Sequence, residues 1–63
     1  MLMQAVEVIF TSHWALITIT YTNSKIHTTV SYQQGLNWMN RLHKSWTWTT
    51  LEDGTEQATW SRN

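Results

Sequence analysis

The three histidines of this 63-residue chain are candidate ligands for a transition metal, because neutral imidazole is a common ligand. His13 falls in an expected turn, His27 in an expected strand and His43 at the end of an expected helix. No two of them have ligand spacing within one element, and the chain has no cysteine to supply a thiolate. The sequence therefore predicts surface or capping histidines, with no metal site and no cofactor.

Nucleophilic catalysis would require a serine or threonine beside an oriented base. Ser12 and His13 are adjacent in the sequence, but neighbouring side chains on a strand or tight turn diverge. Three of the four carboxylates, Glu52, Asp53 and Glu56, surround an expected hairpin tip, where water would solvate them. Because the chain offers no acid–base pair and too little length for a deep pocket, we expect no enzymatic activity.

Five tryptophans could stack nucleobases, as they do in proteins that bind single strands. Affinity for nucleic acid, however, depends mainly on phosphate contacts by lysine and arginine, and this chain has four such residues and a formal net charge of zero. The charge therefore disfavours nucleic acid as a partner.

Length and composition predict one small domain, residues 1–63, near the lower limit for folding alone. Residues 4–31 predict a three-stranded meander, which must end in exposed strand edges, so we expect a homo-oligomer.

The longest apolar run, residues 14–17, is too short to span a bilayer, and the first residues lack the features of a signal peptide. We expect a cytoplasmic protein that does not enter membranes.

The hairpin expected at residues 46–61 has two possible registers. A two-residue turn at Asp53-Gly54 would put Trp60 on the opposite face from Trp46 and Trp48. A three-residue loop of residues 52–54, closed by Gly54 in the left-handed region, instead sets Trp46 opposite Trp60 and Trp48 opposite Ala58. We prefer the second register, because it gathers the apolar side chains on one face. These tryptophans are then expected to lie in the core.

Residues 4–31 alternate with period two and predict a three-stranded meander. Tight turns at Ser12-His13 and Asn23-Ser24 bring the apolar side chains of all three strands to one face. The predicted pairs are Phe10 with Ala15, Val8 with Ile17, Val6 with Ile19, Tyr21 with Ile26, Ile19 with Thr28 and Ile17 with Val30.

The spacing of apolar residues then changes to that of a helix, which we place at residues 32–44. Ser31 and Gln34 have the spacing of a capping box, and Arg41, His43 and Lys44 are expected in the last turn. Gly35 falls on the packed side, where it would allow a close approach to the sheet. The predicted fold is α+β, a five-stranded antiparallel sheet (β-β-β-α-β-β) with one helix packed on one face.

The opposite face of the meander should be polar, yet Ile9 and Leu16 are expected to face each other there with Trp14 close by. An apolar cluster with a polar rim indicates a contact surface for a partner or a second copy. Trp38, at the flank of the helix, is expected to be half exposed and is the second candidate.

These observations favour a small non-enzymatic protein-binding module. Its size is typical of a stoichiometric inhibitor or adaptor, of the kind that mobile elements such as phages encode against a host protein. Two alternatives stay open: single-stranded nucleic-acid binding through exposed tryptophans, and a structural homo-oligomer subunit.

Overall fold

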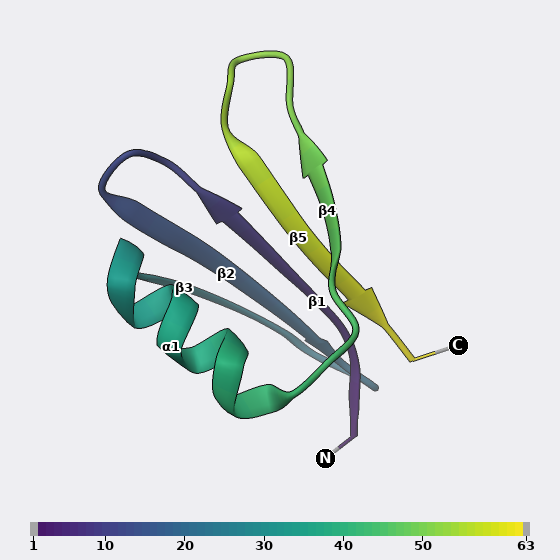
Figure 1. Ribbon diagram of the computed structural model, residues 1–63. Helices are drawn as coiled ribbons and strands as arrows, with labels where there is room; N and C mark the ends of the chain where they lie inside the picture. Colours follow the sequence, from purple (N-terminus) through teal and green to yellow (C-terminus); the bar gives the residue numbers. More distant parts are fainter. Residues whose placement is uncertain (1, 63) are drawn as a thin grey trace.

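The computed structural model describes residues 2–62, in which a five-stranded antiparallel sheet carries one helix on one face (Figure 1). The elements are β1 (Met3–Phe10), β2 (Trp14–Tyr21), β3 (Lys25–Ser31), α1 (Tyr32–Leu42), β4 (Thr47–Thr50) and β5 (Glu56–Ser61). The strand order is β3-β2-β1-β5-β4, so the first strand is central and pairs with the last. The predicted α+β architecture is confirmed.

The first hairpin has the predicted register. Phe10 pairs with Ala15 and Val8 pairs with Ile17. The backbone N–H of Thr11 donates to the carbonyl of Trp14 at 2.9 Å, which closes the turn at Ser12 and His13.

The second turn lies one residue earlier than predicted. The N–H of Tyr21 donates to the carbonyl of Ser24 at 2.8 Å, and Ile19 therefore pairs with Ile26 instead of Thr28. Moving a turn by one residue slides the following strand by two, which leaves every side chain on its original face. The alternating pattern could not distinguish the two turns for this reason, and the predicted pairs of β3 were wrong while its facing was right.

The capping box at the start of α1 is confirmed. The side chain of Ser31 accepts a hydrogen bond from the N–H of Gln34 at 3.2 Å, and the N–H of Ser31 donates to Gln34 Oε1 at 3.2 Å. The helix ends at Leu42, two residues earlier than predicted, because His43 adopts a left-handed conformation with φ of 52°. Of the three basic residues expected in the last turn, only Arg41 lies there.

The second hairpin has the preferred register, with Trp48 opposite Ala58. The N–H of Gly54 donates to the carbonyl of Leu51 at 3.0 Å, and Gly54 has φ of 90°, which confirms the predicted three-residue loop. The paired strand begins at Thr47, so Trp46 lies just outside the ladder that was expected to include it.

The helix packs closely on the sheet at Gly35. A Cβ atom at this position would collide with the Cβ of Ala15 and would lie 3.2 Å from Cε1 of Phe10. The predicted role of Gly35 is therefore confirmed. The buried core consists of Met39 from α1 and six residues of the sheet, Val6, Val8, Phe10, Ala15, Ile17 and Ala58.

The helix covers only part of the apolar face. Figure 1 shows α1 alongside β2 and β3, whereas the β4–β5 hairpin extends beyond it. Trp48 is consequently 49% exposed, which corrects its expected place in the core. Trp46 and Trp60 are half-buried and pack against the core. A helix is only ~10 Å wide, whereas five strands spaced ~4.8 Å apart form a wider sheet.

Candidate protein-binding surface

Three of the predicted site residues come together on the sheet face opposite α1, which we call the outer face. Ile9 and Leu16 are directly paired across β1 and β2, and Trp14 precedes Leu16 by two residues on the same face. Trp14 is 55% exposed and Leu16 is 42% exposed, while Ile9 is half-buried. We call these three residues the outer-face patch.

Polar side chains surround the outer-face patch on the neighbouring strands. Ser31 lies across from Trp14 and Thr29 across from Leu16 on β3, and Gln57 lies across from Ile9 on β5. An apolar centre with a polar rim is the usual composition of a protein contact surface.

The turn before β2 holds the backbone of Trp14 in place. Thr11 Oγ1 accepts a hydrogen bond from the N–H of Trp14 at 3.0 Å, and the N–H of Thr11 donates to the carbonyl of Trp14. The start of α1 is tied to the same turn, since the N–H of Tyr32 donates to the carbonyl of His13 at 3.0 Å. An exposed indole on a fixed backbone loses little backbone freedom when it binds.

Trp38 lies on a different surface from the outer-face patch. It is half-buried, as expected, and lines an open groove of about 370 Å³ between α1 and the β2–β3 part of the sheet. The other residues that line this groove are Ile17, Ile19, Thr28, Val30, Gln34, Asn37 and Arg41. The four predicted binding residues therefore belong to two surfaces on opposite faces of the sheet.

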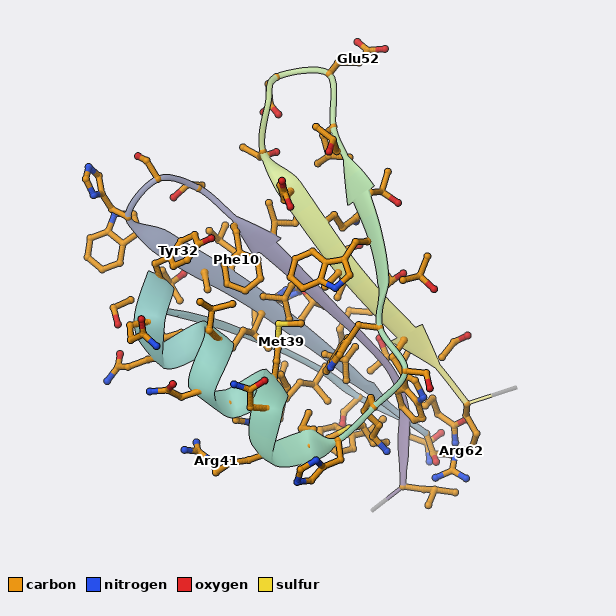
Figure 2. The ribbon with its side chains drawn as sticks, viewed as in Figure 1. Phe10, Tyr32, Met39, Arg41, Glu52 and Arg62 are labelled. Carbon is orange, nitrogen blue, oxygen red and sulfur yellow. The ribbon has the colours of Figure 1, made fainter. Side chains whose placement is uncertain are left out.

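An aromatic cluster on the helix side was not anticipated from the sequence. The ring of Phe10 lies 5.0 Å from that of Tyr32 and is stacked at 5.8 Å with that of Trp48, measured between centroids. Figure 2 shows Tyr32 and Phe10 next to each other at the start of the helix. One signal could have revealed the exposure of Trp48: a single helix is too narrow to cover five strands.

Most acidic side chains lie towards one end of the molecule, and basic side chains lie towards the other. Glu56 lies opposite Phe10 of β1 and Thr50 of β4, at the start of β5 near the tip of the second hairpin. Lys44 lies near the other end of β5, with its Nζ 4.0 Å from the ring centroid of Trp60. Figure 2 shows Glu52 at one end of the molecule and Arg41 and Arg62 towards the other. Three of the four carboxylates, Glu52, Asp53 and Glu56, therefore lie around the tip of the second hairpin, whereas Glu7 lies in the middle of β1.

Asp53 lies in the loop of the second hairpin, where two hydrogen bonds lower the pKa of its carboxyl group. The hydroxyl of Thr55 donates to Asp53 Oδ1 at 2.7 Å, and the N–H of Thr55 donates to the same oxygen at 3.0 Å. These two bonds favour the ionised form and hold the pKa of Asp53 below its ordinary value of 3.8. They stabilise the loop that Gly54 closes.

The histidines lie in three separate places. His13 is in the first turn and His43 caps the helix, while Nδ1 of His27 lies 3.1 Å from Thr18 Oγ1 on the outer face. Within residues 2–62, the structure places no group of three or more histidine, aspartate or glutamate side chains where they could hold a metal ion. The same part of the chain contains no helix that is long and apolar enough to cross a membrane.

Comparisons with protein-family models, with curated proteins and with solved structures found no match to this chain, so its function is inferred from its own residues.

Proposed function

We propose that this protein is a small, non-enzymatic protein-binding module that contacts its partner through the outer-face patch. The single observation that carries the proposal is the 55% exposure of Trp14 on a backbone fixed by hydrogen bonds to Thr11. Tryptophan is among the residues that most often supply binding energy at protein interfaces. Leu16 and Ile9 extend the apolar surface, and the polar rim gives it a boundary.

A binding role fits the placement of the titratable side chains better than catalysis does. The three histidines lie in different elements, and the acidic residues of the second hairpin are exposed at its tip. Catalysis by acid and base requires such groups within hydrogen-bond reach of one reacting centre. A stoichiometric inhibitor or adaptor requires only a surface.

The positions of the exposed tryptophans favour a protein partner over single-stranded nucleic acid. Trp14 lies on the outer face and Trp48 lies on the helix side, so one strand could not stack on both in succession. The carboxylate of Glu56, two residues along β5 from Ala58, the cross-strand partner of Trp48, would also repel a phosphate backbone. We expect titration with single-stranded DNA to give a dissociation constant no tighter than ~10 μM near physiological salt.

The test compares Trp14→Ala with Trp48→Ala. Both residues are about half exposed, but they lie on opposite faces, so each variant is a control for the other. The two variants and the unchanged protein are immobilised and exposed to nuclease-treated lysate from the producing cells, and retained proteins are quantified by mass spectrometry. The affinity of the retained partner is then measured with each variant.

We expect Trp14→Ala to leave the thermal midpoint nearly unchanged and to weaken the partner complex by ~2 kcal/mol or more, about 30-fold in dissociation constant. Trp48→Ala should keep most of the affinity. If immobilised Trp14→Ala binds the same lysate proteins in the same amounts as the unchanged protein does, the outer-face patch is not the contact surface. If Trp48→Ala alone loses the partner, the aromatic cluster on the helix side is the binding site.

A further inference from the structure

Strand β3 is one outer edge of the sheet, and nothing within residues 2–62 pairs with its free side (Figure 1). It has seven residues in regular register with β2, and its residues 25–29 are all exposed. Protected edges are usually short, bulged or interrupted by proline or charge. The other edge, β4, has four residues, whereas β3 is long and carries one charge, Lys25, at its start.

The hydrogen bonds identify which backbone groups of β3 face outward. The bond from Tyr21 to Ser24 marks this pair as hydrogen-bonded, and such pairs alternate along an antiparallel ladder. Ile26, Thr28 and Val30 therefore bond to β2, while His27 and Thr29 direct their N–H and carbonyl groups towards the open edge.

The side chains of β3 leave apolar surface uncovered at this edge. Ile26 is 46% exposed on the helix side of the sheet. Thr28 and Val30, on the same face, line the groove beside Trp38. A strand added to the edge would supply hydrogen-bond partners for β3 and would also cover the apolar surface at Ile26, Thr28 and Val30.

We propose that the added strand is β3 of a second copy, paired antiparallel about a two-fold axis at Thr28. In this register Ile26 of one copy faces Val30 of the other twice, and His27 faces Thr29 twice. The symmetry makes the contact closed and self-complementary, and both helices lie on the same face of a continuous sheet. This pairing is independent of the outer-face patch, which stays open in both copies.

The alternation of hydrogen-bonded pairs excludes most other registers. In an antiparallel pair, two residues that face each other both direct their backbone groups to the neighbouring strand or both direct them away from it. The odd-numbered residues of β3 point to the open edge and the even-numbered ones point to β2, so an even-numbered residue can face only another even-numbered residue. A two-fold at His27 would pair Ile26 with Thr28 and leave Val30 without an apolar partner. A two-fold at Thr29 would pair Val30 with Thr28 and move Ile26 beyond the ladder. Only the axis at Thr28 pairs the apolar side chains with each other.

A cysteine cross-link tests the register, since the chain has no cysteine of its own. In the proposed dimer the two Thr28 residues form a pair without hydrogen bonds, whose Cα atoms are ~4.5 Å apart and within disulfide range. Two Thr29 residues would be displaced by two positions along the strand, and the distance between their Cα atoms would exceed the ~7 Å that a disulfide can bridge. We expect Thr28→Cys to form a covalent dimer on mild oxidation at least ten times faster than Thr29→Cys.

Charge at the axis gives a second test that needs no cross-link. Thr28→Lys places two like charges opposite each other, and Thr49→Lys, at the exposed edge strand β4, is the matched control. Circular dichroism first establishes that both variants are folded. In sedimentation velocity at ~100 μM, the unchanged protein, Thr49→Lys and Trp14→Ala should be dimers, and Thr28→Lys should be a monomer with at least ten-fold weaker association.

The proposal is overturned if the unchanged protein is a monomer at this concentration. It is also overturned if Thr29→Cys cross-links as fast as Thr28→Cys, or if Thr28→Lys and Thr49→Lys dimerise equally. Loss of dimer in Trp14→Ala alone would move the self-contact to the outer-face patch. These outcomes are separate from the fate of the partner complex, because that complex is measured with variants that leave β3 unchanged.

Discussion

Replacing Gly35 by alanine should destabilise the protein although it improves the intrinsic preference of the helix. The new methyl group would collide with the Cβ of Ala15 and would lie 3.2 Å from Cε1 of Phe10. The Cβ of Ala15 is fixed to its backbone and cannot rotate away, so α1 must move off the sheet.

The size of the effect follows from two opposing contributions. Alanine in place of glycine within a helix stabilises by ~1 kcal/mol. Overpacking of a filled core costs ~1–3 kcal/mol, and the collision with a backbone-anchored atom favours the upper end. We therefore expect Gly35→Ala to lower the free energy of unfolding by about 2 kcal/mol.

Urea denaturation followed by tryptophan fluorescence measures this change. Asn40→Ala, at an exposed position of the same helix, is the control and should be neutral or stabilising by ~0.5 kcal/mol. Ala15→Gly removes the atom that is struck, so the double variant with Gly35→Ala should lose less stability than the sum of the two single changes. A Gly35→Ala protein as stable as the unchanged chain would refute the close contact between α1 and β2.

Trp60→Ala should lower the free energy of unfolding by ~2–4 kcal/mol, because the side chain is half-buried against the core. Thr59→Ala, on the outer face, should change it by less than ~1 kcal/mol. If urea denaturation gave the reverse order, the hairpin register would be contradicted. Ser31→Ala removes the cap of α1 and should cost ~1 kcal/mol in thermal unfolding, and an unchanged midpoint would show that the capping bonds contribute nothing. Because the folded pKa of Asp53 is below 3.8, its contribution to stability is fully present above that pH and is lost as the pH falls through the folded value. Thr55→Val should raise this pKa towards 3.8 in an NMR titration of the carboxyl carbon, and an unaltered titration would rule out the hydroxyl as its main cause.

The sequence could predict which face each strand presents, because alternation has a period of two. A slip of one residue in the second hairpin would have separated Trp48 from Ala58, so the pattern selected the register that the structure has. The same pattern could not locate the second turn, because a slide of two residues preserves every face. The outer-face patch of Ile9, Trp14 and Leu16 was predictable for the same reason as the hairpin, since the facing of β1 and β2 followed from their alternation.

Only the tertiary structure decided how the two halves of the chain meet. The sequence defined two sets of strands with apolar faces, but their order depends on β5 pairing with β1, where Val6 faces Trp60 across more than fifty residues of chain. No local pattern encodes such a pairing, because it depends on which apolar surfaces fit together in three dimensions. The position of the helix over β2 and β3 also decided that Trp48 remains exposed, since one helix can cover only part of a five-stranded sheet (Figure 1). The strand order, in turn, decided that β3 is an outer edge of the sheet formed by residues 2–62.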